Sequence, residues 1–463
     1  MPPRDPEENR LTRRLGRYAR VGANVGGVAA RVAGARLMGR DISDPRNGAD
    51  LAAALGGLKG PLMKLAQMLS TVPDLLPAEF AAELRTLQSA APPMGPAFVK
   101  RRMQAELGPD WEKRFARFDR EPAAAASLGQ VHRATGHDGR DLACKLQYPD
   151  MQSAVEADLS QLGVILSLQR RFNPEIDTTE IGQELGDRLR EELDYRREAR
   201  NMRLYGIALK DEPLINVPEP VDELSTRRLL TMTWLDGGPL MSFLDHDLEE
   251  RNRIATALFR AWWVPFARHG IIHGDPHLGN YTVFEAAAKN GGPARPAGIN
   301  LLDFGCIRIF SPTFVAGVVD LFHGFRNDDR ALIARAYERW GFKGLTDEII
   351  DILNIWARFI YAPLLDDRVR TIADGVKPTE YGRREVWQVK QGLKSVKPIT
   401  VPREFVLMDR AAIGLGSVML HLRAELNFHR IFAEAIEDFD IAGLEKRQAK
   451  ALKAAGFSEP TRP

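Results

Sequence analysis

The segment His273-Gly-Asp-Pro-His-Leu-Gly-Asn280 carries the strongest chemical signal in this chain, and Leu301-Leu-Asp-Phe-Gly305 follows it downstream. Phosphoryl transfer needs a carboxylate that orients or deprotonates the attacking hydroxyl, a nearby oxygen ligand for a metal ion, and a carboxylate that bridges magnesium to phosphate. Asp275, Asn280 and Asp303 supply these groups in this order. The two segments therefore predict a nucleotide and magnesium site, with Asp275 as a catalytic residue and Asn280 and Asp303 as metal ligands.

The spacing of these segments is that of protein kinases. The step from Asp275 to Asn280 equals the step between the aspartate and the asparagine of the kinase catalytic loop. Each motif alone also occurs in capped turns without catalytic function, but Leu142-Ala-Cys-Lys145 adds the strand lysine that kinases place on phosphate oxygens. We expect an α+β, protein-kinase-like two-lobed fold that is predominantly helical, with Lys145 as a second catalytic residue.

The pattern of apolar residues agrees with such a fold. Segments of apolar, β-favouring character predict strands at Ala126 to Ala134, Asp141 to Gln147 and Arg227 to Leu235. Helical spacing predicts helices around Phe98 to Leu107, Met151 to Phe172 and Thr178 to Leu209. After Leu248 the chain is expected to be mainly helical, apart from short segments at 271–284 and 299–309.

These elements predict five regions along the chain. They are a basic N-terminal helical segment (1–50), a helical module (51–110), a kinase-like N-lobe with inserted helices (111–235), a kinase-like C-lobe (236–440) and a C-terminal tail (441–463). Within the module, apolar residues recur at helical spacing from Leu51 to Leu87, and prolines divide them into short helices.

Composition excludes several classes of protein. With 463 residues, 44% hydrophobic residues, 27% charged residues and a net charge of +2, the chain is neither disordered nor a polycation that coats nucleic acid. Two cysteines, Cys144 and Cys306, exclude a disulfide framework and indicate a reducing compartment. No stretch reaches the roughly 18 apolar residues of a membrane span. We expect a cytoplasmic protein, either free or peripheral on the inner face of the membrane.

The N-terminal end is locally basic. Nine arginines lie within the first forty residues, against only three acidic residues. Residues Leu11 to Met38 fit a helix that rests on anionic lipid, with arginines toward the headgroups and valine and alanine toward the acyl chains. They fit equally well a solvated basic helix that packs on the protein, because glycines weaken the helix and neither Trp nor Phe is present in it.

An alanine-rich stretch stands where protein kinases have a glycine-rich loop over the phosphates. Residues Ala123 to Arg133 read Ala-Ala-Ala-Ala-Ser-Leu-Gly-Gln-Val-His-Arg. Each Cβ restricts positive φ angles and keeps backbone N–H groups farther from a phosphate, so we expect the nucleotide to be held differently. By itself the stretch also fits the start of a packed helix. The residues predicted to bind the nucleotide are Ala124, Ala125, Ala126, Ser127, Lys145, Glu198, Met232 and Trp234.

Taken together, the stretch Ala-Ala-Ser-Leu-Gly-Gln-Val-His, the His-Gly-Asp-Pro-His-x-x-Asn loop and the upstream Lys64-Leu-Ala-Gln67 resemble the UbiB-like family of atypical kinases. This family is associated with ubiquinone biosynthesis, and the likeness runs from about Leu55 to about Arg430. The resemblance implies a kinase-like fold with an added N-terminal helical module, whose Lys-x-Gly-Gln helix folds over the active site. Alanine stands here where the family usually has glycine.

The resemblance also implies regulatory residues. Lys64 and Gln67 lie three positions apart on one helical face and are expected to point toward the nucleotide, although spacing alone fits a surface lysine and a capping glutamine. Glu192 and Asp194 match the family's Glu-x-Asp motif and are expected to contact the Lys64 helix. Glu198, expected on the same helix face as Asp194, is predicted to pair with Lys145. The reverse assignment of the acidic residues stays open.

The predicted substrate is not a peptide. No Ala-Pro-Glu segment follows Asp303, and the chain passes directly into the helical Val315 to Phe325, which leaves no long loop for a peptide. We therefore expect an enzyme that binds ATP or ADP with Mg²⁺ and acts as an ATPase or as a small-molecule or lipid-linked kinase in ubiquinone biosynthesis. Expected partners are an anionic membrane lipid, a quinone precursor and enzymes of that pathway.

Two other functions fit part of the pattern. A small-molecule phosphotransferase of the aminoglycoside or choline kinase type shares the two motifs but gives no role to Lys64 and Gln67. A nucleotide-sensing pseudokinase scaffold is disfavoured by the intact catalytic residues. His132 and His277 are expected to make polar contacts rather than to bind a metal ion, and Trp262 and Trp263 are expected in the core.

Overall fold

The computed structural model of the protein describes residues 94–126, 128–157, 159–160, 186–187, 189–286, 294–373, 382–394 and 402–457. The predicted basic helix, the helical module before residue 94, most of the helix predicted for 151–172 and the first part (178–185) of the helix predicted for 178–209 lie outside these residues. The chain divides into two compact units, which we call the first unit (Met1–Arg197 with Pro220–Trp234) and the second unit (Glu198–Glu219 with Leu235–Pro463).

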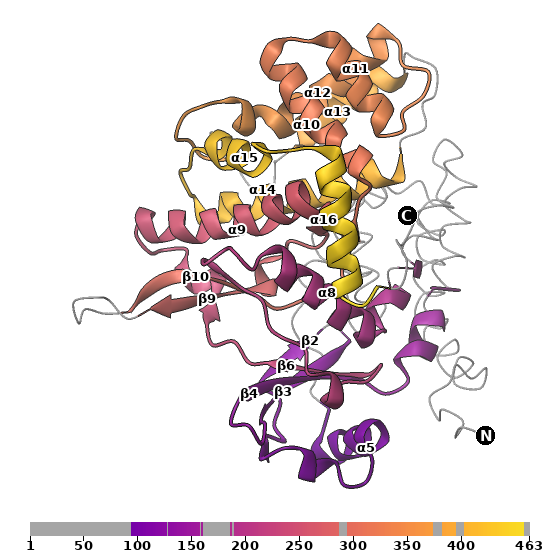
Figure 1. The fold of residues 1–463 in the computed structure, drawn as a ribbon, viewed down its shortest axis with the longest axis vertical. Helices are drawn as coiled ribbons and strands as arrows, with labels where there is room; N and C mark the ends of the chain where they lie inside the picture. Colours follow the sequence, from indigo (N-terminus) through magenta and orange to yellow (C-terminus); the bar gives the residue numbers. More distant parts are fainter. Residues whose placement is uncertain are drawn as a thin grey trace, which may run out of the picture. The chain divides into compact units, whose positions relative to one another are not determined.

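The first unit contains an antiparallel sheet (Figure 1). Its strands are β1 (Arg117–Phe118), β2 (Ala124–Ala126), β3 (Gly129–Thr135), β4 (Asp141–Gln147) and β6 (Leu229–Thr233). They follow the order β1-β3-β4-β6, and β2 pairs with β3. The three predicted strands are present. Ala126 belongs to the preceding strand β2 instead of β3, so the alanine-rich stretch is a strand and not the start of a helix.

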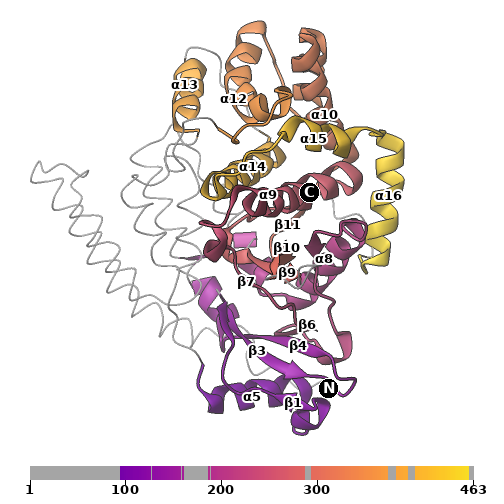
Figure 2. The same ribbon diagram turned by 90° about the vertical axis from the view of Figure 1, so that its left-hand side faces the viewer.

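One face of this sheet is buried against α5 (Pro96–Leu107) and the short helix η2 (Trp111–Arg114). Because successive strand residues point to opposite faces, β3 and β4 each send every second side chain into this core. Its members include Val99, Met103, Trp111, Cys144 and Leu146. Both ribbon views show α5 alongside the strands (Figures 1 and 2). The opposite face, which carries Lys145, stays partly exposed.

A buried polar contact ties Met94, two residues before α5, to the sheet. Gln130 is fully buried on β3, and its Oε1 accepts a hydrogen bond from the Met94 N–H at 2.6 Å. Its Nε2 donates to the Met94 carbonyl at 3.3 Å and to His132 Nε2 at 2.8 Å. Because His132 Nε2 is then an acceptor, Nδ1 carries the proton and donates to the Asp119 carbonyl at 2.8 Å. The buried amide thus hydrogen-bonds both backbone groups of Met94.

The long helix predicted from 178 to 209 is interrupted. One helical segment ends at Glu192, and α8 (Tyr195–Ala208) begins after a break at Leu193 and Asp194. Asp194 Oδ1 accepts from the backbone N–H groups of Arg196 at 3.1 Å and Arg197 at 3.4 Å, which is the geometry of a helix N-cap. The prediction that Asp194 and Glu198 share a helix face is therefore wrong, because Asp194 precedes the helix that carries Glu198.

The second unit contains two small sheets. Strands β5 (Ile215–Asn216), β10 (Arg295–Leu301), β9 (Tyr281–Ala286) and β7 (Gly238–Pro239) form one sheet in this order, and only β5 and β10 are parallel among them. Strands β8 (Ile271–His273) and β11 (Ile307–Ile309) form an antiparallel pair. The segments predicted as non-helical after Leu248 are these strands and the loops that join them.

Helices make up the rest of this unit. They are α9 (Leu248–His269), α10 (Pro312–Asn327), α11 (Arg330–Arg339), α12 (Asp347–Leu365), α13 (Arg383–Lys394), α14 (Arg403–Leu422), α15 (Phe428–Ile436) and α16 (Ile441–Ala454). Both views show α9 next to the β9 and β10 strands, with α14 and α15 on its other side (Figures 1 and 2). Trp262 and Trp263 of α9 are buried in the core, as predicted. Over the described ranges, no helix has the length and apolar character of a membrane span.

Two predicted boundaries differ from the structure. Residues 441–463 are predicted as a tail, but α16 packs on the second unit because Leu444 and Leu452 are buried and Gln448 donates to the carbonyls of His269 and Phe310. Residues 198–219, predicted within the N-lobe, belong to the second unit. Their strand β5 pairs with β10, a contact of long sequence separation that local patterns do not reveal.

Candidate functional site

The two predicted motifs lie on adjacent loops of the second unit. The loop 274–280 joins β8 to β9, and the loop 302–306 joins β10 to β11. At one end the Gly274 N–H donates to the Cys306 carbonyl at 2.7 Å, and at the other the Leu302 N–H donates to the Asn280 carbonyl at 3.0 Å. A Cβ at position 274 would lie 2.9 Å from the Cys306 carbonyl oxygen, so glycine permits this close approach. The backbone thereby holds both motifs together.

His273 connects the loops through its ring. Its Nδ1 accepts from the Asp275 N–H at 3.2 Å, and its Nε2 lies 2.7 Å from the Asp303 carbonyl oxygen. Because an amide N–H only donates and a carbonyl only accepts, Nε2 carries the proton and the ring is neutral in this arrangement. The ring is 4% exposed. His273 therefore positions the backbone of both aspartates that carry the predicted chemistry.

The three predicted functional side chains are half-buried and come from these two loops. Asn280 Nδ2 donates to the Asp275 carbonyl at 2.9 Å, which orients the amide and leaves its oxygen end as the possible metal ligand. Asp303 Oδ1 accepts from the Gly305 N–H at 3.0 Å. Local hydrogen bonds thus fix Asn280 and Asp303, as a preorganised site requires.

Side chains of helix α8 contact the backbone of the Asp-Phe-Gly segment. Asn201 Nδ2 donates to the Phe304 carbonyl at 2.8 Å, and the Phe304 N–H lies 3.5 Å from Glu198 Oε1. The Phe304 ring is fully buried and contacts Tyr205, whose ring also lies edge-on to His273. Sequence reasoning did not find Asn201 or the role of His273. The spacing of Glu198 and Asn201, one helical turn apart, was the available signal.

In the first unit, strand register gathers the predicted nucleotide residues on one face. Lys145 lies opposite Val131 on β3 and Leu230 on β6, and Met232 lies opposite Ala143, two residues before Lys145. Directly paired residues share a face of the sheet. Lys145 and Met232 are therefore on the same side, and the Lys145 ammonium lies 5.2 Å from the centre of the Tyr195 ring.

The alanine-rich strand divides between the two faces. Ala124 pairs with Val131 and Ala126 pairs with Gly129, so both lie on the Lys145 face. Ala125 pairs with Gln130 and lies on the opposite face, so the structure separates it from the other predicted nucleotide residues. The Trp234 ring is covered by the Arg133 guanidinium at 4.9 Å. Ser127 lies outside the described residues.

The donor set of the second unit fits Mg²⁺. Magnesium in nucleotide sites is bound through oxygen, commonly by one or two carboxylates, together with phosphate and water. Asp303 and Asn280 offer a carboxylate and an amide oxygen within two hydrogen-bonded loops, which meets this requirement once phosphate completes the shell. Among the residues that the structure describes, three or more His, Cys, Asp or Glu side chains nowhere form a group that could hold a metal ion by themselves.

The remaining predicted residues have other surroundings. His132 is fully buried in the polar contact with Gln130, and the exposed His277 accepts from the Gly279 N–H at 3.1 Å, so both histidines make local polar contacts as predicted. Burial raises the pKa of the Cys144 thiol to about 12, so this cysteine behaves as a small apolar residue.

Four predicted regulatory residues and one ion pair stay predictions. Lys64 and Gln67 lie outside the described residues. Glu192 ends a helical segment, and Asp194 caps α8, which gives this carboxylate a structural role in addition to its predicted one. The pair between Lys145 and Glu198 joins residues of different units and is kept as a hypothesis.

Comparison with known proteins bears on this arrangement. The family model described as the ABC1 atypical kinase-like domain matches residues 86–337, which is more than half of the chain. The chain belongs to this family. The matched region contains β2 to β4, α8 and both loops of the second unit. The kinase-like fold and the resemblance to UbiB-like atypical kinases predicted from the motifs are therefore confirmed.

Relatives in this family come from distant organisms. "Atypical kinase coq-8, mitochondrial" of Caenorhabditis elegans is 30% identical over 92% of this chain and 58% of its own length. "Atypical kinase COQ8, mitochondrial" of Saccharomyces cerevisiae is 31% identical over 56% of this chain and 50% of its own length. The chain spans only about a third to two thirds of the length of the curated relatives it matches.

A solved structure also resembles this chain. Rv3197 of Mycobacterium tuberculosis, determined in complex with erythromycin, is 28% identical and has a TM-score of 0.57. The similarity covers 87% of this chain and 97% of that protein. The likeness therefore extends over most of the chain and well beyond the residues that the family model matches.

Proposed function

We propose that this protein is a magnesium-dependent atypical kinase or ATPase that binds ATP or ADP. One observation carries the proposal: the two loops of the second unit are joined at both ends by backbone hydrogen bonds, which brings the oxygen ligands of Asn280 and Asp303 together with Asp275. Such a cluster of acidic and amide oxygens serves phosphoryl transfer. Membership of the atypical kinase family supports the same reading.

Each residue then has a defined task. Asn280 and Asp303 hold Mg²⁺, which neutralises charge on the phosphates when it is bound. Asp275 orients or deprotonates the attacking hydroxyl or water, and its position is set by the Asn280 amide and the His273 ring. Lys145 contacts phosphate oxygens, while Ala124, Ala126 and Met232 of the same sheet face line the nucleotide.

The proposed phosphate acceptor is water, a small molecule or a lipid-linked compound. Strand β11 covers Ile307–Ile309 and α10 begins at Pro312, so the chain after Asp-Phe-Gly is regular structure rather than a long peptide-docking loop. We further propose that the protein supports ubiquinone biosynthesis, as the UbiB-like resemblance implies. The basic segment at 11–38 would then bring it to an anionic membrane surface, where Lys64 and Gln67 regulate the site.

The binding part of the proposal is tested by thermal unfolding. Mg-ATP and Mg-ADP are expected to raise the melting temperature of the full chain, because a ligand that binds only the folded state stabilises it. Asp303→Asn should abolish the shift by removing the metal ligand. Asp211→Asn is the matched control, because the Asp211 side chain is 73% exposed on the surface. An unchanged shift in Asp303→Asn would contradict the assigned site.

The catalytic part is tested by turnover. Purified protein is assayed for ATP hydrolysis with and without anionic liposomes, phenolic quinone precursors and candidate proteins. Hydrolysis that anionic liposomes stimulate supports the membrane-associated ATPase, and equal rates with the first forty residues deleted remove the role of the basic segment. Transfer to an aminoglycoside or to choline would favour the small-molecule phosphotransferase. Nucleotide binding with no turnover would favour a pseudokinase scaffold.

A further inference from the structure

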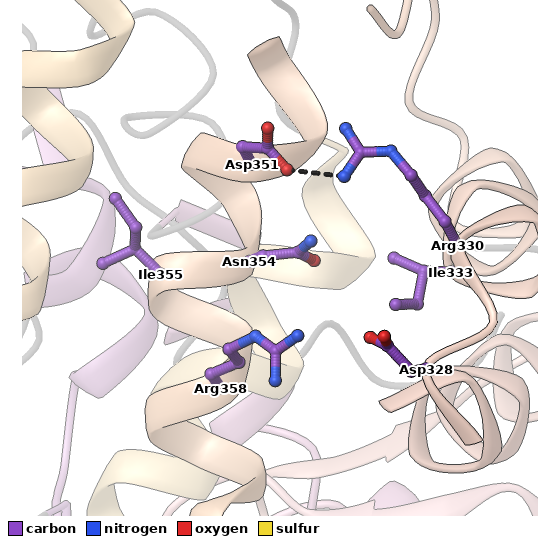
Figure 3. Close-up of a pocket in the computed structure, with 7 residues that line it drawn as sticks. All are labelled: Asp328, Arg330, Ile333, Asp351, Asn354, Ile355 and Arg358. Carbon is purple, nitrogen blue, oxygen red and sulfur yellow. Dashed lines mark hydrogen bonds and ion pairs between the residues drawn. The ribbon is translucent and has the colours of Figure 1, made fainter. Parts of the chain in front are cut away.

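A cavity of about 380 Å³ lies between α11 and α12 in the second unit (Figure 3). Its size falls within the range of small-ligand sites, roughly 300–1,000 Å³. Two arginines, two aspartates, one asparagine and two isoleucines line it: Asp328, Arg330, Ile333, Asp351, Asn354, Ile355 and Arg358. None of these residues belongs to the proposed nucleotide site, so a ligand in this cavity would be bound separately from the nucleotide.

The inner wall of the cavity is fixed by buried contacts. Ile333 is 3% exposed and Asn354 is 8% exposed. The buried Tyr337 hydroxyl donates to Asn354 Oδ1 at 2.9 Å. Because this bond occupies the oxygen end of the amide, Nδ2 is the end that can donate to a ligand. The close-up shows the Asn354 amide directed toward Ile333, across the cavity (Figure 3).

The charged residues form two pairs. Arg330 and Asp351 are already joined by an ion pair, whereas Arg358 and Asp328, which we call the open pair, are not joined to each other. Arg330 Nη1 lies 2.8 Å from Asp351 Oδ1, and Arg330 Nε lies 3.1 Å from Asp347 Oδ1, so carboxylates already neutralise this guanidinium. Arg358 differs, because its guanidinium rests 4.7 Å from the centre of the Phe325 ring. Over the described part of the chain, no carboxylate forms an ion pair with Arg358.

Asp328 completes the open pair. Its carboxylate and the Arg358 guanidinium face one another across the lower part of the cavity in Figure 3, and no ion pair joins them among the described contacts. Asp328 ends α10 with φ 53°, the left-handed conformation of a helix C-cap. The cavity therefore presents a cation with an amide donor on one wall and a carboxylate on the other.

The opposite charges of Arg358 and Asp328 determine which ligand charge the cavity favours. A simple anion would meet the Asp328 carboxylate, and a simple cation would meet the Arg358 guanidinium. A molecule that carries both charges contacts both walls with opposite sign. We propose that the cavity between α11 and α12 binds a small zwitterion, with its carboxylate or phosphate on Arg358 and Asn354 and its ammonium group on Asp328.

Calorimetric titration of the full chain tests this site. The probes are O-phosphoethanolamine and β-alanine as zwitterions, with inorganic phosphate, propionate and ethanolamine as singly functional analogues. At least one zwitterion is expected to bind saturably and at least tenfold more tightly than each analogue. The two zwitterions distinguish a phosphate from a carboxylate ligand. Absence of saturable binding by both, or equal affinity for an analogue, overturns the proposal.

Variants locate the binding. Arg358→Gln and Asp328→Asn are each expected to weaken the zwitterion at least tenfold. Asparagine also tolerates the left-handed conformation, so Asp328→Asn removes the charge and keeps the helix end. Arg335→Gln is the matched control, because this exposed arginine lies on α11 away from the cavity lining. Wild-type affinity in both Arg358→Gln and Asp328→Asn, with unchanged melting temperatures, would refute the site.

Discussion

The sheet face around Lys145 and the paired loops around Asp275 are built by different means. On the sheet, cross-strand register alone places Ala124, Ala126, Lys145 and Met232 on one side. In the loops, side chains and backbone groups hold each other through His273, Asn280 and the hydrogen bonds at both loop ends.

Because of this difference, the two regions should respond differently to substitutions. A strand keeps its register when one partly exposed side chain changes, so the sheet face should tolerate substitutions and respond mainly in nucleotide affinity. A loop held by a few specific hydrogen bonds loses geometry when one of them is lost. We therefore expect losses of catalysis and stability from the loops, and graded losses of binding from the sheet face.

The largest effect is expected from Asp275→Asn. The variant keeps the shape of the side chain but removes the carboxylate that orients or deprotonates the acceptor, so turnover should fall on the order of 10²- to 10⁴-fold. The thermal shift by Mg-ADP should persist, because Asn280 and Asp303 are unchanged. Steady-state hydrolysis and thermal unfolding measure the two quantities. Loss of the shift together with turnover would mean that Asp275 acts in binding.

A smaller but still large effect is expected from Gly274→Ala. The added Cβ would lie 2.9 Å from the Cys306 carbonyl oxygen and 3.1 Å from the Cys306 sulfur, which forces the two loops apart. Overpacking of this kind costs about 1–3 kcal/mol. Denaturant unfolding should therefore show a lower free energy of unfolding than for wild type. Gly139→Ala, on the β3–β4 turn, serves as a comparison. An added Cβ there meets no atom within 4 Å, so this variant strains the backbone only through its φ of 81°.

The buried side of the sheet should respond to pH through His132. Burial lowers the pKa of His132 below its usual value of about 6.5, outweighing the hydrogen bond to the Asp119 carbonyl that raises it. At this position the unfolded chain binds a proton more readily than the folded chain. The contribution of His132 to the free energy of unfolding is therefore fully present above pH 6.5 and is lost as the pH falls through 6.5 toward the lowered pKa. Unfolding free energies of wild type and His132→Leu, measured from pH 8 to 5, should diverge in slope. Parallel slopes would show that His132 does not contribute.

The smallest effect is expected on Mg-ADP affinity, and it should differ between substitutions at two neighbouring alanines. Ala126→Leu places a bulky side chain on the Lys145 face and should weaken Mg-ADP binding by about tenfold, the low end of the roughly 1–3 kcal/mol that one misplaced methylene group costs in a pocket. Ala125→Leu places the same side chain on the opposite face, where Ala125 is exposed, and should leave the affinity unchanged. Equal affinities for the two variants would contradict the role of this face in nucleotide binding.

Much of the fold and the candidate site was predictable from local sequence. Strands β3, β4 and β6 follow from short segments of apolar, β-favouring character, and the two loops follow from motif spacing. The break before α8 was not predicted, because an aspartate such as Asp194 also occurs on helix surfaces, and its N-cap geometry depends on the chain that follows. Asn201 was missed for a related reason: its partner, Phe304, lies about a hundred residues away.

The hydrogen bonds between Gln130 and Met94 limit how the chain can be shortened. A fragment that began at residue 111, the predicted start of the N-lobe, would lose α5 and leave the apolar face of the sheet in water. Val99, Met103 and Leu107 are buried there, and each buried side chain of this kind contributes about 1.5–3 kcal/mol. It would also remove the Met94 backbone groups that the Gln130 amide now binds. A soluble fragment of the kinase-like region should therefore begin upstream of Met94.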